Sequence, residues 1–156
     1  MDAVRLLETI TKAFAAERFE VVLIGNAAAA IEGAPVTTDD FDFMFRPTRG
    51  NFTKMKAVAR RLGAAVSQPE YPVSRFYRIM NNEEGLQIDL MGVVDGVKSF
   101  ESLRSRASRI FFGEASLMVA NLADVIKSKR QAGRPKDKVV IPLLEETLKF
   151  IRGDGR

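Results

Sequence analysis

The chain has 156 residues, a length typical of one domain that buries about two-thirds of its unfolded surface. It contains no cysteine and no histidine, which excludes disulfides, thiolate zinc sites and histidine-based acid–base catalysis. The formal net charge of +4 suits a nucleotide or nucleic-acid partner, although an ordinary basic surface would have the same charge.

The first residues are amphipathic and mixed in charge, unlike a signal peptide. No apolar run reaches the ~18–20 residues that a membrane-spanning helix needs. We therefore expect a cytoplasmic protein without membrane contact. Residues 1–152 are predicted to form one domain, followed by a flexible tail at 153–156.

The first elements are a helix, a short strand and a second helix. Apolar side chains at helical spacing predict a helix over residues 2–18, and the all-apolar run Val21–Ile24 predicts a strand buried on both faces. A helix over 27–32 follows, with Asn26 as its N-cap.

The turn at Gly25 and Asn26 joins that strand to that helix. Backbone N–H groups at such a turn form a ready site for a phosphate group. A simple strand-to-helix turn with a permissive glycine explains the same residues, so the turn alone does not establish a phosphate site.

The run from Thr37 to Phe45 predicts a strand with one apolar and one acidic face. Phe41, Phe43 and Phe45 would point one way, and Asp40 and Asp42 the other. Two carboxylates about 7 Å apart repel each other, and a divalent cation would offset that repulsion. Asp39 is expected to face outward.

Asp89 lies on a later predicted strand whose opposite face is apolar. On a strand next to the first acidic strand it would converge on Asp40 and Asp42. A half-exposed strand with one polar residue facing outward explains Asp89 equally well. The elements expected in this part of the chain are a helix at 51–63, a short strand at 65–66, a hairpin of strands 73–80 and 86–94, a helical turn at 99–103, and a hairpin of strands 106–112 and 115–120.

Two helices end the chain. Asn121 is predicted to cap a helix over 122–131, on which Lys129 occupies a position of the buried stripe. Such a lysine either extends to the edge of the core or reaches into a site. The segment from Lys127 to Lys138 holds six basic residues, which indicates either a solvated loop or a phosphate-binding edge. The last helix, from Pro135 to about residue 151, has as its expected core face Val140, Leu143, Leu144, Leu148 and Ile151.

This order of elements predicts an α/β (α+β) fold with a mixed β-sheet flanked by helices. Taken together, the motifs resemble the nucleotidyltransferase superfamily with the DNA polymerase β-like catalytic fold. In particular they resemble small bacterial relatives of the AbiEii-type abortive-infection toxins. The resemblance is carried by Gly25-Asn26, Thr38, Asp40-Phe41-Asp42, Asp89, and the C-terminal pattern Lys129, Ala132, Gly133, Arg134, Lys136 and Asp137.

The resemblance implies an enzyme that moves a nucleoside monophosphate from an NTP to a hydroxyl group and releases pyrophosphate. The acceptor would be an RNA 3′ end, a protein or a small molecule, and an antitoxin or a second copy of the chain would be a partner. The catalytic and metal-binding residues would be Asp40, Asp42 and Asp89, which would hold Mg²⁺ or Mn²⁺. The residues binding the NTP would be Gly25, Asn26, Thr38, Lys129 and Arg134.

Two departures from the family pattern keep other functions open. The second residue of the glycine turn is Asn26 rather than glycine or serine, and Val36 stands where many relatives have arginine. One alternative is a non-catalytic binding or regulatory module, such as a component of a toxin–antitoxin pair. Another is a metal-dependent nuclease, although that function gives Lys129 and the glycine turn no role.

Overall fold

The computed structural model describes residues 3–38, 40–69 and 76–153. The predictions for Asp39, for residues 73–75 and for the tail at 154–156 lie outside the described residues. The elements are α1 (Ala3–Ala16), β1 (Val21–Ile24), α2 (Gly25–Ile31), β2 (Phe41–Phe45), α3 (Arg49–Arg61), β3 (Ala65–Ser67), β4 (Phe76–Asn81), β5 (Leu86–Met91), α4 (Phe100–Arg106), β6 (Ser108–Phe112), β7 (Ala115–Val119), α5 (Leu122–Ala132) and α6 (Pro135–Arg152).

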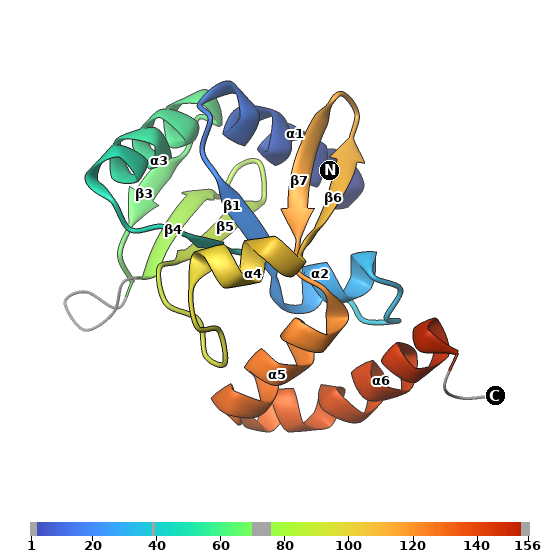
Figure 1. The fold of residues 1–156 in the computed structure, drawn as a ribbon. Helices are drawn as coiled ribbons and strands as arrows, with labels where there is room; N and C mark the ends of the chain where they lie inside the picture. The colour runs from blue at the N-terminus through green and yellow to red at the C-terminus, as the bar shows by residue number, and fades with distance from the viewer. Residues whose placement is uncertain (1–2, 39, 70–75, 154–156) are drawn as a thin grey trace.

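The strands form one seven-stranded sheet in the order β3-β4-β5-β2-β1-β7-β6 (Figure 1). Strand β1 pairs antiparallel with β2 and parallel with β7, while β2 pairs parallel with β5. The predicted hairpins β4–β5 and β6–β7 flank the central strands β2 and β1, and β3 adds an edge strand next to β4. The structure therefore confirms the prediction of an α/β fold with a mixed sheet.

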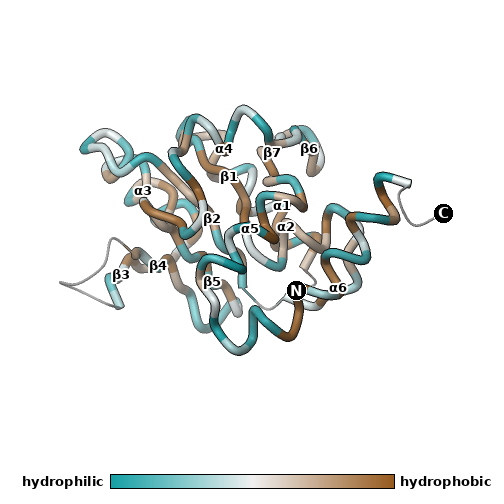
Figure 2. The backbone as a smooth tube through the Cα atoms, turned by 60° about the horizontal axis from the view of Figure 1, so that its bottom comes forward, coloured by the Kyte–Doolittle hydropathy of each residue, from teal (hydrophilic) through white to brown (hydrophobic). Residues whose placement is uncertain are grey.

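The core is centred on β1 and β2. All four residues of β1 are buried, as predicted, and hydrophobic colour runs along the central strands in Figure 2. Phe14, Phe19, Phe43 and Phe45 pack as tilted or edge-to-face rings, with centroids 5.0–6.0 Å apart. The alternation that places Phe41, Phe43 and Phe45 in the core also fixes the register of β2.

The C-terminal helices lie together at one end of the sheet (Figure 1). As predicted, Asn121 caps α5 by accepting a hydrogen bond from the backbone of Asp124, and Gly133 ends the helix in a left-handed conformation. Helix α6 packs mainly against α5 and projects away from the sheet. The expected core face of this helix is therefore only partly correct, because Leu144 is buried but Leu143 and Ile151 are exposed.

Several predicted boundaries are wrong. Strand β5 ends at Met91 rather than at residue 94, and the strand expected from residue 106 begins at Ser108. The second difference arises because α4 continues to Arg106, after a capping box between Ser99 and Ser102.

The N-cap prediction for Asn26 is also wrong. Helix α2 begins at Gly25, directly after β1, and Ile24 occupies the cap position. The positive φ of Gly25, 68°, lets the chain turn from strand to helix without a connecting residue.

No helix in the described parts of the chain is long and apolar enough to cross a membrane.

Candidate active site

A cleft of about 470 Å³ opens between the sheet and the C-terminal helices. Its walls come from the end of β1, from β2 and the segment before it, from the loop after β5, and from α5 and the start of α6. Seven of the eight residues predicted to act in catalysis or binding line it: Gly25, Asn26, Thr38, Asp40, Asp42, Lys129 and Arg134. The eighth, Asp89, is not among the described residues that line the cleft.

Asp42 is the acidic residue at the centre of the site. It sits in β2, beside Ile24 of β1 on one side and Asp89 of β5 on the other. Burial raises the pKa of Asp42 to about 6, and the nearby carboxylates of Asp89 and Asp40 add to that effect. The positive charges of Lys129 and Lys136 oppose it. The negative charge of Asp42 is therefore only partly compensated by the protein.

Asp40 reaches the same cleft in a different way from that expected. It is exposed and lies in a bend before β2, so it does not share a strand face with Asp42. The bend is stabilised by Thr38, whose hydroxyl donates to the backbone oxygen of Asp40 over 2.6 Å. This bend brings both carboxylates to one cleft although only one of them belongs to the strand.

Of the two arrangements that the sequence leaves open for Asp89, the register shows the one on the strand next to the acidic strand, since Asp42 and Asp89 are paired neighbours. Its carboxylate, however, accepts hydrogen bonds from Arg78 of β4: Nε lies 2.8 Å from Oδ1, and Nη2 lies 3.3 Å from Oδ2. No pattern in the sequence singled out Arg78. The β4–β5 hairpin register, which places Arg78 opposite Asp89, was the signal that would have revealed it.

The glycine turn lies against Asp42. A Cβ atom added at Gly25 would be 3.1 Å from Oδ2 of Asp42, so the glycine allows the carboxylate to approach the backbone closely. The side-chain oxygen of Asn26, which also lines the cleft, is buried and accepts no hydrogen bond from the described residues.

Lys129 and Arg134 form the basic side of the cleft. Lys129 belongs to the buried stripe of α5, as predicted. Its Nζ lies 3.6 Å from Oδ1 of Asp137, and Arg134 Nε donates to the other oxygen over 2.7 Å. Burial lowers the pKa of Lys129, while the charges of Asp137 and Asp42 act in the opposite direction.

Asp137, the last residue of the C-terminal pattern in the sequence, is a further residue of the site that was not among those predicted to act in catalysis or binding. Its side chain is only 1% exposed, and it lies in the first turn of α6. Burial would raise the pKa of Asp137, but the hydrogen bond and charge of Arg134 hold it below its usual value. An ionised Asp137 therefore holds two basic side chains at one wall of the cleft.

The donor set fits a divalent cation in part. Asp40 and Asp42 offer carboxylate oxygens, the ligands that Mg²⁺ prefers, and the raised pKa of Asp42 shows that a cation there would offset unfavourable charge. Among the residues described, no three acidic side chains are grouped so that they could hold a metal ion together. The expected third ligand, Asp89, is instead bonded to Arg78.

No family model and no curated protein matches the sequence. Several solved structures resemble the chain in three dimensions, including the following two. The antibiotic-resistance factor ANT(2'')-Ia has a TM-score of 0.62 and 14% identity, covering 98% of this chain and 90% of that one. A Thermotoga maritima protein named as a nucleotidyltransferase has a TM-score of 0.60 and 18% identity, covering 91% and 92%. At these identities the likeness shows that the chain shares the fold of these two structures.

Proposed function

We infer that the chain is a metal-dependent nucleotidyltransferase. The observation that supports this most strongly is the composition of the cleft. Asp40 and Asp42 form one wall and Lys129 and Arg134 another, within a fold that nucleotidyltransferases share. A triphosphate with its divalent cation needs both kinds of wall, because the cation requires oxygen ligands and the phosphates require positive charge.

The walls would divide the binding of the substrate between them. Asp40 and Asp42 would hold Mg²⁺ or Mn²⁺, which when bound supplies positive charge for the reacting phosphate. Lys129 and Arg134, kept in place by Asp137, would contact the outer phosphates. Backbone N–H groups at Gly25 and Asn26 would approach the same phosphates, and Thr38 would fix the bend that carries Asp40.

The reaction is a displacement at the α-phosphorus of the NTP. A hydroxyl oxygen of the acceptor forms the new bond, the bond to the β-phosphate oxygen breaks, and pyrophosphate leaves. The hydroxyl proton passes to a carboxylate of the cleft or to water. No histidine is needed, which agrees with the absence of histidine from the chain.

The acceptor is an RNA 3′ end, a protein hydroxyl or a small molecule. The neighbour ANT(2'')-Ia is described as an antibiotic-resistance factor, which favours testing small molecules as well as macromolecules. The resemblance to AbiEii-type toxins favours a cytoplasmic enzyme with an antitoxin or a second copy of the chain as its partner.

Transfer of label identifies the acceptor directly. The chain is incubated with Mg²⁺, each α-labelled NTP, and separate fractions of cellular RNA, protein and small molecules. We expect label in one fraction with the wild type and none with Asp42→Asn or without Mg²⁺. Label that appears equally with Asp42→Asn would contradict the assignment, because Asp42 is at the centre of the cleft.

A further inference from the structure

Three charged side chains stand in one row across the sheet. Asp42 of β2 is paired with Asp89 of β5, and Asp89 is paired with Arg78 of β4. Asp89 therefore has a carboxylate on one side and a guanidinium on the other. Its own side chain is only 8% exposed, so water compensates little of its charge.

The contact between Arg78 and Asp89 is bidentate. Both carboxylate oxygens are used, at 2.8 Å and 3.3 Å from the nitrogens of Arg78. Two parallel hydrogen bonds between charged groups fix orientation as well as distance. The Asp89 carboxylate is thus held towards β4, on the side away from Asp42.

Neighbouring side chains hold Arg78 in this position. Its guanidinium lies over the ring of Phe76, 5.2 Å from the ring centroid. In the amide orientation that satisfies its hydrogen bonds, the Gln87 oxygen accepts from Nε of Arg78 at 3.2 Å. The guanidinium is therefore positioned by three partners and is only 26% exposed.

We propose that Arg78 takes the place of a divalent cation at Asp89, and that the two compete for this carboxylate. This inference rests on the proposed function, in which Asp40 and Asp42 hold the cation. With Arg78 bound, the charge of Asp89 is already paired and both its oxygens accept hydrogen bonds. Asp89 then contributes to cation binding only when Arg78 leaves, and Arg78 determines the affinity of the acidic row for cations.

The test is a calorimetric titration of the nucleotide-free protein with Mn²⁺ at pH 7.5. Arg78→Gln should bind Mn²⁺ at least about tenfold more tightly than the wild type, because a positive charge no longer competes for Asp89 or repels the divalent ion. Asp89→Asn alone should stay within about twofold of the wild type. The double variant Arg78→Gln/Asp89→Asn should lose the increase in Mn²⁺ affinity. That loss would show that the increase comes from the freed carboxylate of Asp89.

The matched control is Arg46→Gln. Arg46 also stacks on a phenylalanine, Phe100, and is also paired with carboxylates, but these are Glu20 and Glu101, neither of which belongs to the row of Asp42 and Asp89. Its Mn²⁺ affinity should be that of the wild type. Arg78→Lys keeps the charge but loses the fork of two hydrogen bonds, so its affinity should lie between those of the wild type and Arg78→Gln.

Two results would overturn the inference. The first is unchanged or weaker Mn²⁺ binding by Arg78→Gln, and the second is a tenfold loss in Asp89→Asn, which would make Asp89 a ligand in the wild type. If Arg78→Gln does not fold, the Mn²⁺ affinity of Asp89→Asn alone decides whether Asp89 is a cation ligand in the wild type. A different pair of results refutes the cation site of the proposed function itself: wild-type Mn²⁺ affinity in Asp42→Asn, or no Mn²⁺ binding by any variant. Failure of the proposed function is therefore distinguishable from failure of the Arg78 inference.

Discussion

Replacing Asp42 with asparagine should make the metal-free protein more stable at neutral pH. Burial, with the carboxylates of Asp89 and Asp40, raises the pKa of Asp42 from 3.8 to about 6. A difference of about two pKa units corresponds to about 3 kcal/mol between the folded and unfolded chains. Asparagine keeps the shape of the side chain but carries no charge at any pH, so it removes this cost.

The pH dependence gives the prediction its sign. The folded chain binds the Asp42 proton more tightly than the unfolded chain does. The stability supplied by this group is therefore fully present below pH 3.8 and is lost as the pH rises through about 6. Asp42→Asn should exceed the wild type by up to about 3 kcal/mol at pH 7.5, and by about half of that at pH 5.

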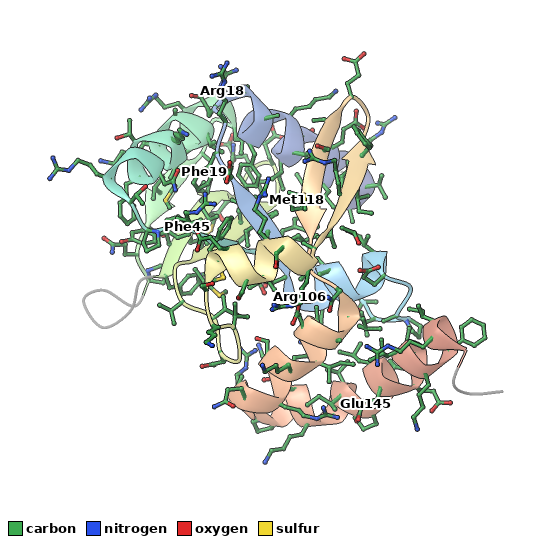
Figure 3. The ribbon with its side chains drawn as sticks, viewed as in Figure 1. Arg18, Phe19, Phe45, Arg106, Met118 and Glu145 are labelled. Atoms are coloured by element: carbon green, nitrogen blue, oxygen red, sulfur yellow. The ribbon has the colours of Figure 1, made fainter. Side chains whose placement is uncertain are left out.

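The assay is urea denaturation with EDTA at both pH values, with melting temperatures as a second measure. For a chain of this size 3 kcal/mol corresponds to about 6–12 °C. Asp124→Asn is the matched control, because Asp124 also lines the cleft but its carboxylate is paired with a basic side chain. Its partner is Arg106, with Nε 2.8 Å from Oδ2 of Asp124, and this pair joins α4 to α5 (Arg106 is labelled in Figure 3). The control should not gain stability. If Asp42→Asn is no more stable than the wild type at pH 7.5, or gains equally at pH 5, the charge of Asp42 does not destabilise the folded chain in this way.

Three further substitutions test the other walls of the cleft. Gly25→Ala should cost at least about 1 kcal/mol in urea denaturation, because the position has a φ of 68° and the new Cβ would lie 3.1 Å from Asp42; a neutral result would show that the turn adjusts freely. Asp137→Asn should destabilise the chain by about 3 kcal/mol, since it leaves Lys129 and Arg134 without their shared carboxylate. Its control is Glu145→Gln, which breaks the exposed Arg130–Glu145 pair between the same helices and should cost under about 1 kcal/mol. Equal losses in the two variants would contradict the importance of burial. Lys129→Met should weaken calorimetric binding of Mg·NTP at least about tenfold without unfolding the protein, and unchanged affinity would remove Lys129 from the phosphate site.

The elements that the sequence predicted best are those with strong local patterns. The apolar run of β1, the phenylalanine alternation in β2 and the helical stripe that includes Lys129 can each be recognised within a few neighbouring residues of the sequence. The sequence left open whether Asp89 faces outward or lies beside Asp42, and the register of β2 and β5 shows that the two are neighbours.

The parts that the sequence did not predict depend on contacts between distant segments. Helix α6 has an apolar pattern, but the pattern does not say that the helix would pack on α5 and leave Leu143 exposed. Asp40 reaches the cleft through a bend, which strand periodicity cannot describe. Arg78 was missed because its role appears only when the hairpin is paired residue by residue with Asp89.

In the proposed function, the cleft binds a nucleoside triphosphate with a divalent cation through Asp42. The most direct test is calorimetric titration of the wild type and of Asp42→Asn with each NTP, once in the presence of Mg²⁺ and once in the presence of EDTA. We expect saturable binding by the wild type that requires Mg²⁺ and is lost in the folded variant. No Mg²⁺-dependent binding of any NTP by the wild type would contradict the account.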